Sequence, residues 1–122
     1  MSEETKQTVY AYWQGWQTKD FTGMRAALAD EVVADAGLFR VEGADKFVAM
    51  CADGPAWRDV EMLDEMYGEN HAAILYEGIN TANEQRMRVA ELIRLEGGKI
   101  MEIQSCLSPL TMLEGEVKRG GA

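Results

Sequence analysis

The sequence predicts an α+β fold in which a curved antiparallel sheet wraps around N-terminal helices, forming a cone-shaped barrel with a pocket. Two observations carry this prediction. An aromatic stripe at helical spacing opens the chain, and a long alternating run, Gln85–Leu107, follows several shorter strand-like runs. With 122 residues, 47% of them apolar, the chain is long enough to bury one core. We therefore expect one domain over residues 1–122, ordered from about residue 4 to about residue 113.

The first predicted element is a helix over residues 4–18. Its apolar residues follow the i, i+3, i+4, i+7 spacing of one helix face: Val9, Tyr12, Trp13 and Trp16. Such a stripe is typical of core packing, and it can also line a pocket. Tyr12 differs from the tryptophans because its hydroxyl must reach a hydrogen-bond partner once the ring is buried.

A second, short helix is expected to end near Asp30, with Asp20 or Thr22 as its N-cap. Residues 31–41 then read as a strand, with a bulge at the glycine. Alternation places Asp35 on the side that carries the larger apolar residues: Val33, Phe39 and Val41. A carboxylate on that side is unusual, which makes Asp35 a candidate functional residue.

Residues 44–52 predict another short helix, opened by Gly43. Two strands follow, at about 58–67 and 71–80, joined by a turn at 68–70. The one histidine, His71, lies at the start of the second of these strands. A solvated edge position is the plain interpretation of His71, and a catalytic base is the alternative.

The hairpin register depends on its turn. A two-residue Gly97–Gly98 loop without a bulge would mix polar and apolar side chains on both faces. We therefore predict a three-residue loop, 96–98, which pairs Leu95 with Lys99 and Glu91 with Ile103. The other expected pairs are Ile93 with Met101, Val89 with Ser105, and Met87 with Leu107.

Glu91 is the most unusual residue of this hairpin. Alternation points its side chain into an apolar face, among Val89, Ile93 and Ile103. A carboxyl group there must stay protonated, find a hydrogen-bond partner or face a cavity. Glu91 is therefore either a structural carboxylate, bonded to a Tyr hydroxyl, a Trp N–H or water, or a functional acid.

Several functional classes are excluded by composition. A net charge of −9 and a pI near 4.5 argue against partners such as nucleic acid or an anionic membrane surface. The apolar runs are too short to span a bilayer, and the start MSEETKQ does not read as a signal peptide. Cys51 and Cys106 are expected to be free thiols in the cytoplasm. With one histidine and no calcium-loop spacing, we expect no metal and no cofactor.

The order of elements resembles the nuclear transport factor two-like superfamily, and within it the SnoaL-like and ketosteroid-isomerase-like proteins. The likeness covers about Val9 to Leu107. It rests on four segments: WQGWQTKDF, LADEVVAD, the helix opened by Gly43, and AELIRLEGGKIMEI. The resemblance implies a single SnoaL-like domain. It does not by itself imply one activity, because one scaffold hosts many functions.

The isomerase branch implies a set of roles. Its first-helix Tyr corresponds to Tyr12, its protonated late-strand acid to Glu91, and its proton-shuttling Asp to Asp35. Here Asp35 comes one residue early, no Pro follows it, and Glu91 is one methylene longer than the family's Asp. The resemblance thus implies general acid-base proton transfer next to a carbonyl, as in an isomerase, cyclase or dehydratase. The expected lining residues for a small apolar substrate are Trp13, Trp16, Phe39, Val89, Met101 and Ile103.

Other interpretations remain open. The epoxide hydrolase branch needs an Asp–Arg–Asp set, but the last strand offers Gln104 and Ser105 in place of the second acid. The dehydratase branch relies on histidines, and His71 stands alone. A non-catalytic module for apolar ligands is favoured by the eight methionines. The half-apolar outer sheet face, with Leu92 and Cys106, would suit a homodimer contact or a structural domain.

Overall fold

A computed structural model describes residues 2–110, and the expected end of the ordered core near residue 113 lies outside that range. Three helices precede or interrupt a six-stranded sheet of order β2-β1-β6-β5-β4-β3. The helices are α1 (Ser2–Thr18), α2 (Phe21–Ala26) and α3 (Ala44–Asp53). The strands are β1 (Leu28–Asp35), β2 (Arg40–Glu42), β3 (Trp57–Tyr67), β4 (His71–Asn80), β5 (Gln85–Glu96) and β6 (Lys99–Pro109).

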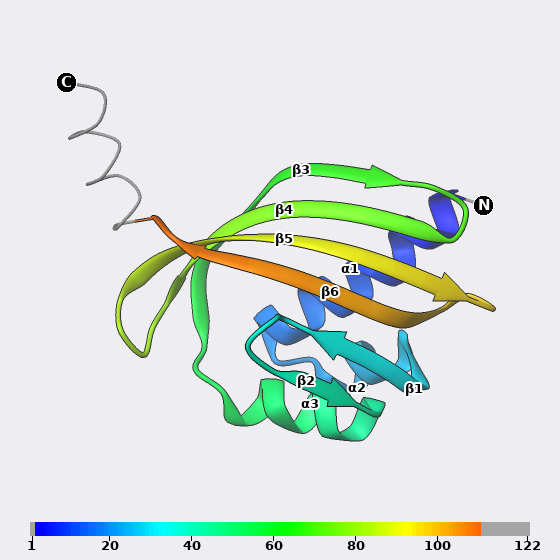
Figure 1. Cartoon of the computed structure of the whole chain (residues 1–122), viewed down its shortest axis with the longest axis horizontal. Helices are drawn as coiled ribbons and strands as arrows, with labels where there is room; N and C mark the ends of the chain where they lie inside the picture. The colour runs from blue at the N-terminus through cyan, green and yellow to red at the C-terminus, as the bar shows by residue number, and fades with distance from the viewer. Residues whose placement is uncertain (1, 111–122) are drawn as a thin grey trace.

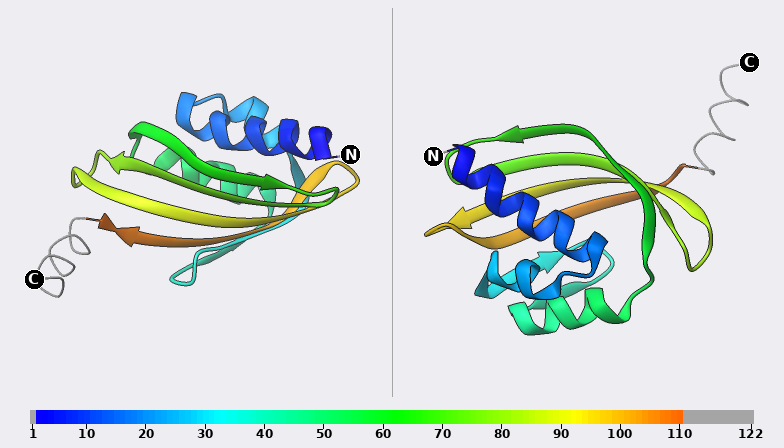
Figure 2. Two further views of the ribbon diagram at one scale, coloured as in Figure 1. Left: turned by 90° about the horizontal axis from the view of Figure 1, so that it is seen from above. Right: turned by 180° about the vertical axis from the view of Figure 1, so that it is seen from behind.

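The predicted fold class is confirmed, with two refinements. The sheet curves along its length, and the helices pack on one of its faces and leave the other uncovered (Figures 1 and 2). The sheet stays open, because β2 and β3 are edge strands. It is also mixed, because β1 runs parallel to β6 while the remaining pairs are antiparallel.

The core lies between the concave sheet face and α1. Val9, Tyr12 and Trp13 of α1 are buried, as the aromatic stripe predicts. On the sheet side, alternate residues of the central strands face this helix, including Ile74 of β4 and Ile93 of β5. Burial of these apolar side chains is the main stabilising term, and it holds α1 across the sheet.

The segment after α1 differs from the sequence prediction. Asp20 does cap α2, accepting a hydrogen bond from Gly23 N at 3.0 Å. However, α2 ends at Ala26 rather than near Asp30, because the chain enters a parallel ladder in which Leu28 pairs with Ile100. The predicted single strand over 31–41 is also interrupted, since a turn at 36–39 folds the chain back into β2. Non-local strand pairing overrides local helix propensity here.

The predicted hairpin register is wrong, for a clear structural reason. Glu96 pairs with Lys99, so the loop has two residues, Gly97 and Gly98, with φ values of 57° and 78°. Positive φ at both central residues is the requirement of a type I′ turn, which favours Gly. The register then shifts at Met101, an extra residue of β6 between the Leu95–Ile100 and Arg94–Glu102 pairs.

This bulge restores a coherent apolar face that the two-residue loop alone would lose. Beyond it, Ile93 pairs with Ile103, and Glu91 pairs with Ser105 instead of Ile103. Glu91 therefore still points inward, but a hydroxyl-bearing residue lies opposite it across the ladder.

No helix among residues 2–110 is long and apolar enough to cross a membrane. Cys51 and Cys106 are both free thiols.

Candidate active site

Glu91 lies near the middle of β5, with its carboxyl group in the space between the sheet and α1. Only 4% of the residue is exposed. Its two carboxyl oxygens are held by different tyrosines. The Tyr12 hydroxyl donates to Oε1 at 2.9 Å, and the Tyr76 hydroxyl donates to Oε2 at 2.7 Å. A Tyr hydroxyl, one of the partners that the sequence leaves open for Glu91, is thus present in Tyr12, and Tyr76 completes a buried Tyr–Glu–Tyr cluster.

Each member of this cluster is placed by a regular element. Helical periodicity turns Tyr12 of α1 towards the sheet, where its ring stacks on Phe47 of α3 at 6.1 Å between centroids. Strand alternation turns Tyr76 of β4 and Glu91 of β5 to the same face. In the β4–β5 ladder Tyr76 pairs with Val89, two residues from Glu91. That diagonal separation is within reach of a long aromatic side chain.

Two tryptophans hold the Tyr76 ring in position. Trp13 meets it edge-on at 5.6 Å between ring centroids, and Trp16 lies tilted at 5.8 Å. Trp16 also makes an edge contact with Trp57 of β3 at 5.9 Å. The aromatic stripe of α1 therefore fixes the geometry of a hydrogen-bond donor to Glu91, in addition to filling the core.

Burial dominates the electrostatics of the cluster. Desolvation raises the pKa of Glu91, and the hydrogen bonds from Tyr76 and Tyr12 and the Ser105 hydroxyl act in the opposite direction. The pKa values of Tyr12 and Tyr76 are raised well above the usual value by burial first and then by the neighbouring Glu91. Burial, with a smaller contribution from Glu91, raises the pKa of the Cys51 thiol to about 12. All three effects favour the neutral form of these groups.

A cavity of about 350 Å³ reaches this cluster. Tyr12, Tyr76 and Glu91 form part of its wall, together with Cys51 and Ser105. Most of the remaining wall is apolar or aromatic, including Trp16, Phe39, Phe47, Trp57, Val89 and Ile103. A small apolar cavity with a few convergent polar groups has the character of a small-molecule site.

Asp35 lies at the end of β1 and lines the same cavity. Its side chain is 39% exposed, so it faces both the cavity and solvent. Oδ1 accepts a hydrogen bond from Gly37 N at 2.8 Å, and Oδ2 lies 3.7 Å from Nη1 of Arg40. The carboxylate is thus engaged by the turn that follows it, and turning towards a ligand would exchange these contacts.

The sequence-predicted lining residues divide into two groups. Trp16, Phe39, Val89 and Ile103 belong to the cavity wall. Trp13 does not, because it packs behind Tyr76 with 6% of its surface exposed. Met101 is also elsewhere, since the β6 bulge places it in a hollow beside Arg25 and Leu28.

Sequence reasoning missed Tyr76 as a member of the site. The available signal was its place in the alternating run of β4, on the same face as Ile74. Phe47, Trp57 and Cys51 were also missed, because only the packing of α3 and β3 brings them to the cavity. Among residues 2–110, no group of three or more His, Cys, Asp or Glu side chains could hold a metal ion.

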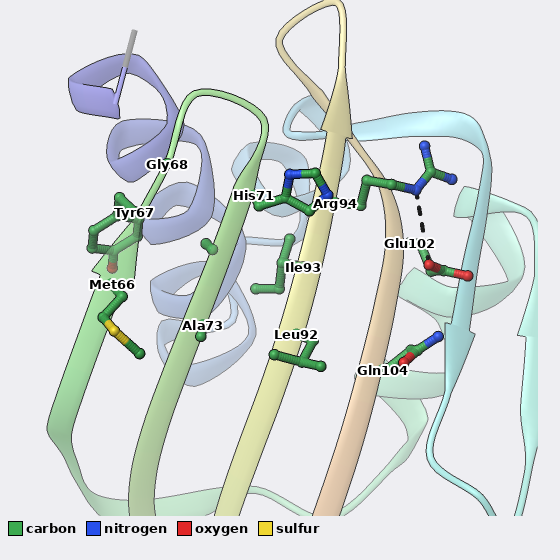
Figure 3. Close-up of a pocket in the computed structure, with 11 residues that line it drawn as sticks. Met66, Tyr67, Gly68, His71, Ala73, Leu92, Ile93, Arg94, Glu102 and Gln104 are labelled. Carbon is green, nitrogen blue, oxygen red and sulfur yellow. Dashed lines mark ion pairs between the residues drawn. The ribbon is translucent and has the colours of Figure 1, made fainter.

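A second hollow, of about 470 Å³, lies on the uncovered face of the sheet (Figure 3). It is lined by outward-pointing residues that alternate with those facing the core, such as Leu92 and Arg94. His71 lies here at an exposed position, as its edge placement predicts. The sheet separates this hollow from Glu91, so the two sites are distinct.

A known family shares the sequence pattern of this chain. The family model described as the SnoaL-like domain matches residues 9–103, which is most of the chain. The chain belongs to the SnoaL-like domain family. The matched range includes Tyr12, Asp35, Tyr76 and Glu91, so the carboxyl group and its hydroxyl partners all lie within the SnoaL-like domain.

Solved structures share the fold of this SnoaL-like domain. A candidate ketosteroid isomerase from Kribbella flavida matches with a TM-score of 0.80 and 13% identity, covering 88% of this chain and 79% of that chain. An LEH-like epoxide hydrolase from M. tuberculosis matches with a TM-score of 0.78 and 17% identity. The match covers 96% of this chain and 92% of the hydrolase chain. An NTF2-like protein of unknown function from Mesorhizobium loti matches with a TM-score of 0.76 and 20% identity. The match covers 88% of this chain and 93% of that chain. A search of curated proteins finds no match.

Proposed function

We propose that this SnoaL-like domain is a small-molecule enzyme that moves a proton next to a carbonyl group, as an isomerase, cyclase or dehydratase does. The observation that carries the proposal is the buried Glu91 carboxyl group, hydrogen-bonded by Tyr12 and Tyr76 in the wall of a mostly apolar cavity. Hydroxyl donors held in a dry pocket can stabilise an oxyanion that develops during reaction, an effect worth about 3–4 kcal/mol for one donor.

In the proposed reaction Asp35 is the general base. Its carboxylate takes a proton from the carbon next to the substrate carbonyl, and the electron pair of the broken C–H bond moves onto the carbonyl oxygen. The resulting enolate oxygen lies at the Tyr–Glu–Tyr cluster, which donates a hydrogen bond to it. Returning the proton from Asp35 to a different carbon completes an isomerisation.

The apolar wall supports a small apolar substrate with one carbonyl group. Trp16, Phe39, Val89 and Ile103 would contact its hydrocarbon part, while the cluster around Glu91 would hold its oxygen. A neutral carboxylic acid beside a Tyr hydroxyl forms the oxyanion site of ketosteroid isomerase, whose chemistry is of this kind.

The test is turnover of a panel of small unsaturated ketones by the wild-type protein and by Asp35→Asn. Loss of the base should lower kcat by about 10²–10⁴-fold. Asp30→Asn is the matched control, because Asp30 lies on the same strand with a side chain that is 87% exposed. Unchanged turnover in Asp35→Asn would remove the proposed base, and absence of turnover across the panel would contradict this reaction class for these ketones.

A non-catalytic binding module is the second candidate function. The observation that favours it is the contact between Asp35 and Gly37 N, which holds the proposed base in a local turn. In that case ligands would occupy the cavity and be released unchanged. Binding without turnover, followed by Trp16 and Trp57 fluorescence, would favour this candidate.

We also propose that the protein is a cytoplasmic homodimer. The uncovered sheet face carries exposed apolar side chains, among them Leu92 at 61% and Met66 at 65% exposure. Sedimentation analysis of the wild-type protein, Leu92→Arg and Leu38→Arg would test it. Leu38 is 99% exposed but lies in the turn between β1 and β2, so it serves as the control. A dimer that only Leu92→Arg weakens is expected, and a monomeric wild type would contradict the proposal.

A further inference from the structure

The Tyr–Glu–Tyr cluster has a limited supply of hydrogens. Each tyrosine hydroxyl carries one, and an ionised carboxylate carries none. In the structure both hydroxyls are used internally, Tyr12 at 2.9 Å from Oε1 and Tyr76 at 2.7 Å from Oε2 of Glu91. With Glu91 ionised, the cluster therefore has no O–H left for a ligand.

Protonation of Glu91 changes this balance by one hydrogen. The new carboxyl O–H can donate to one tyrosine oxygen at the existing separation. That tyrosine then turns its own O–H into the cavity, while the other tyrosine keeps donating to the remaining carboxyl oxygen. One O–H thus becomes available to donate to a ligand, and every buried polar group of the cluster keeps a partner. An unpaired buried polar group would cost free energy and weaken binding.

We infer that the cavity selects neutral ligands with a carbonyl-type acceptor oxygen, and that each ligand is captured together with one proton from solvent, which resides on Glu91 and releases a tyrosine hydroxyl. Glu91 itself does not contact the ligand in this arrangement. It is a positioning residue, and the tyrosine it releases is the group that touches the ligand oxygen. This inference rests on the proposed function for the identity of the site, and it specifies the ligand class.

The groups that face Glu91 come from every element around it. Tyr12 belongs to α1, Cys51 to α3, Tyr76 to β4 and Ser105 to β6. None of these four is a cation, so none of them holds the buried carboxylate in its charged form by ion pairing. Asp35 of β1 lines the same cavity, and it is not a cation either.

A second cluster of the same composition provides the control. Glu65 of β3 accepts hydrogen bonds from the Tyr10 and Tyr67 hydroxyls at 2.8 and 3.2 Å. Both bonds go to the same oxygen, the cluster is only partly buried, and Lys6 lies 3.7 Å from that oxygen. Glu65 does not belong to the cavity wall. Glu65→Gln therefore repeats the chemical change of Glu91→Gln outside the site.

The experiment compares 1-indanone with indane, two ligands of similar shape that differ in the carbonyl oxygen. Neither titrates, so a pH effect on the ratio of their affinities reports on the protein. Binding is followed by tryptophan fluorescence from about pH 5 to about pH 9, a range above the ordinary carboxyl pKa of 4.5, because burial raises the pKa of Glu91. In the wild type and in Glu65→Gln, the preference for indanone should fall by about tenfold or more as pH rises.

Glu91→Gln should behave differently. The glutamine amide donates to one tyrosine and accepts from the other at every pH, so it imitates the protonated acid. The variant should keep its preference for indanone with no pH dependence. Calorimetry of the wild-type protein in two buffers of different ionisation enthalpy should show uptake of about one proton per indanone at the upper end of the range. This readout does not depend on any variant folding.

The inference would be overturned if the wild-type preference for indanone over indane did not change with pH, or if Glu91→Gln showed the same pH dependence. Indanone binding without proton uptake would also overturn it. Failure of both ligands to bind would overturn the ligand class. None of these readouts requires turnover. Proton-linked binding with no turnover would thus reject the enzyme proposal alone.

Discussion

The hydroxyl of Tyr76 on β4 lies 2.7 Å from Oε2 of Glu91 on β5, two residues along the ladder from its own strand partner. This contact occupies the carboxyl oxygen that Tyr12 leaves free. It converts a buried acid with one partner into a cluster in which both oxygens are satisfied. The stability and the pH response of the domain should both depend on it.

Removing the Tyr76 hydroxyl should destabilise the fold. Tyr76→Phe keeps the ring between Trp13 and Trp16 but leaves one buried carboxyl oxygen of Glu91 without its donor. We expect a loss of about 1.5–3 kcal/mol in the free energy of unfolding, measured by urea denaturation. Tyr67→Phe is the control, since its 3.2 Å bond goes to the partly exposed Glu65 and should cost less. Equal losses would mean that burial of Glu91 adds nothing.

The stability of the wild-type protein should depend on the protonation of Glu91. Burial raises the pKa of Glu91 in the folded state above its usual 4.5, so the folded protein holds the proton more tightly than the unfolded chain. This contribution is complete below pH 4.5 and is lost as pH rises through the folded-state pKa. Glu91→Gln lacks it. The variant should therefore gain stability relative to wild type as pH rises from about 4.5 towards 8, measured by denaturation at each pH. A constant difference would contradict the raised pKa.

Gly78 of β4 allows Trp57 to reach the cavity wall. A Cβ at this position would lie 2.9 Å from Cε3 of Trp57 and 3.0 Å from Cγ2 of Val60. Gly78→Ala should therefore displace the indole, lower the free energy of unfolding by about 1–3 kcal/mol and weaken ligand binding. Denaturation and tryptophan emission would measure both effects. Gly68→Ala is the control, because a Cβ there would lie 3.6 Å from the nearest atom. It should change neither the free energy of unfolding nor ligand binding.

The two-residue turn between β5 and β6 makes a prediction about its glycines. Gly97 and Gly98 both have positive φ, at 57° and 78°. Asparagine tolerates this conformation, so Gly97→Asn should be neutral or stabilise by up to about 1 kcal/mol through the unfolded state. Gly98→Val should cost about 1–2 kcal/mol, because a β-branched residue is strained there. Thermal melts would measure both. The predicted three-residue loop would instead need only one such glycine.

Local pattern was enough to predict much of this molecule. The α1 stripe, the alternation of β5 and the burial of Glu91 follow from side-chain periodicity, which depends on neighbouring residues alone. The sequence also indicated that the buried carboxyl group of Glu91 and the buried phenol of Tyr12 each need a hydrogen-bond partner, and in the structure they bond to each other. The functional roles of Tyr12, Asp35 and Glu91 stay predictions.

What the tertiary structure alone decided is the pairing between distant elements. The bulge at Met101 sets which β6 residues share the face of Glu91, and it brings Ser105 opposite in place of Ile103. The parallel contact between β1 and β6 ends α2 early, and the turn after β1 engages Asp35. Strand register, bulges and diagonal contacts such as Tyr76 to Glu91 depend on how whole strands fit against one another. Periodicity assigns each side chain to a face, but only the packed sheet determines which side chains meet there.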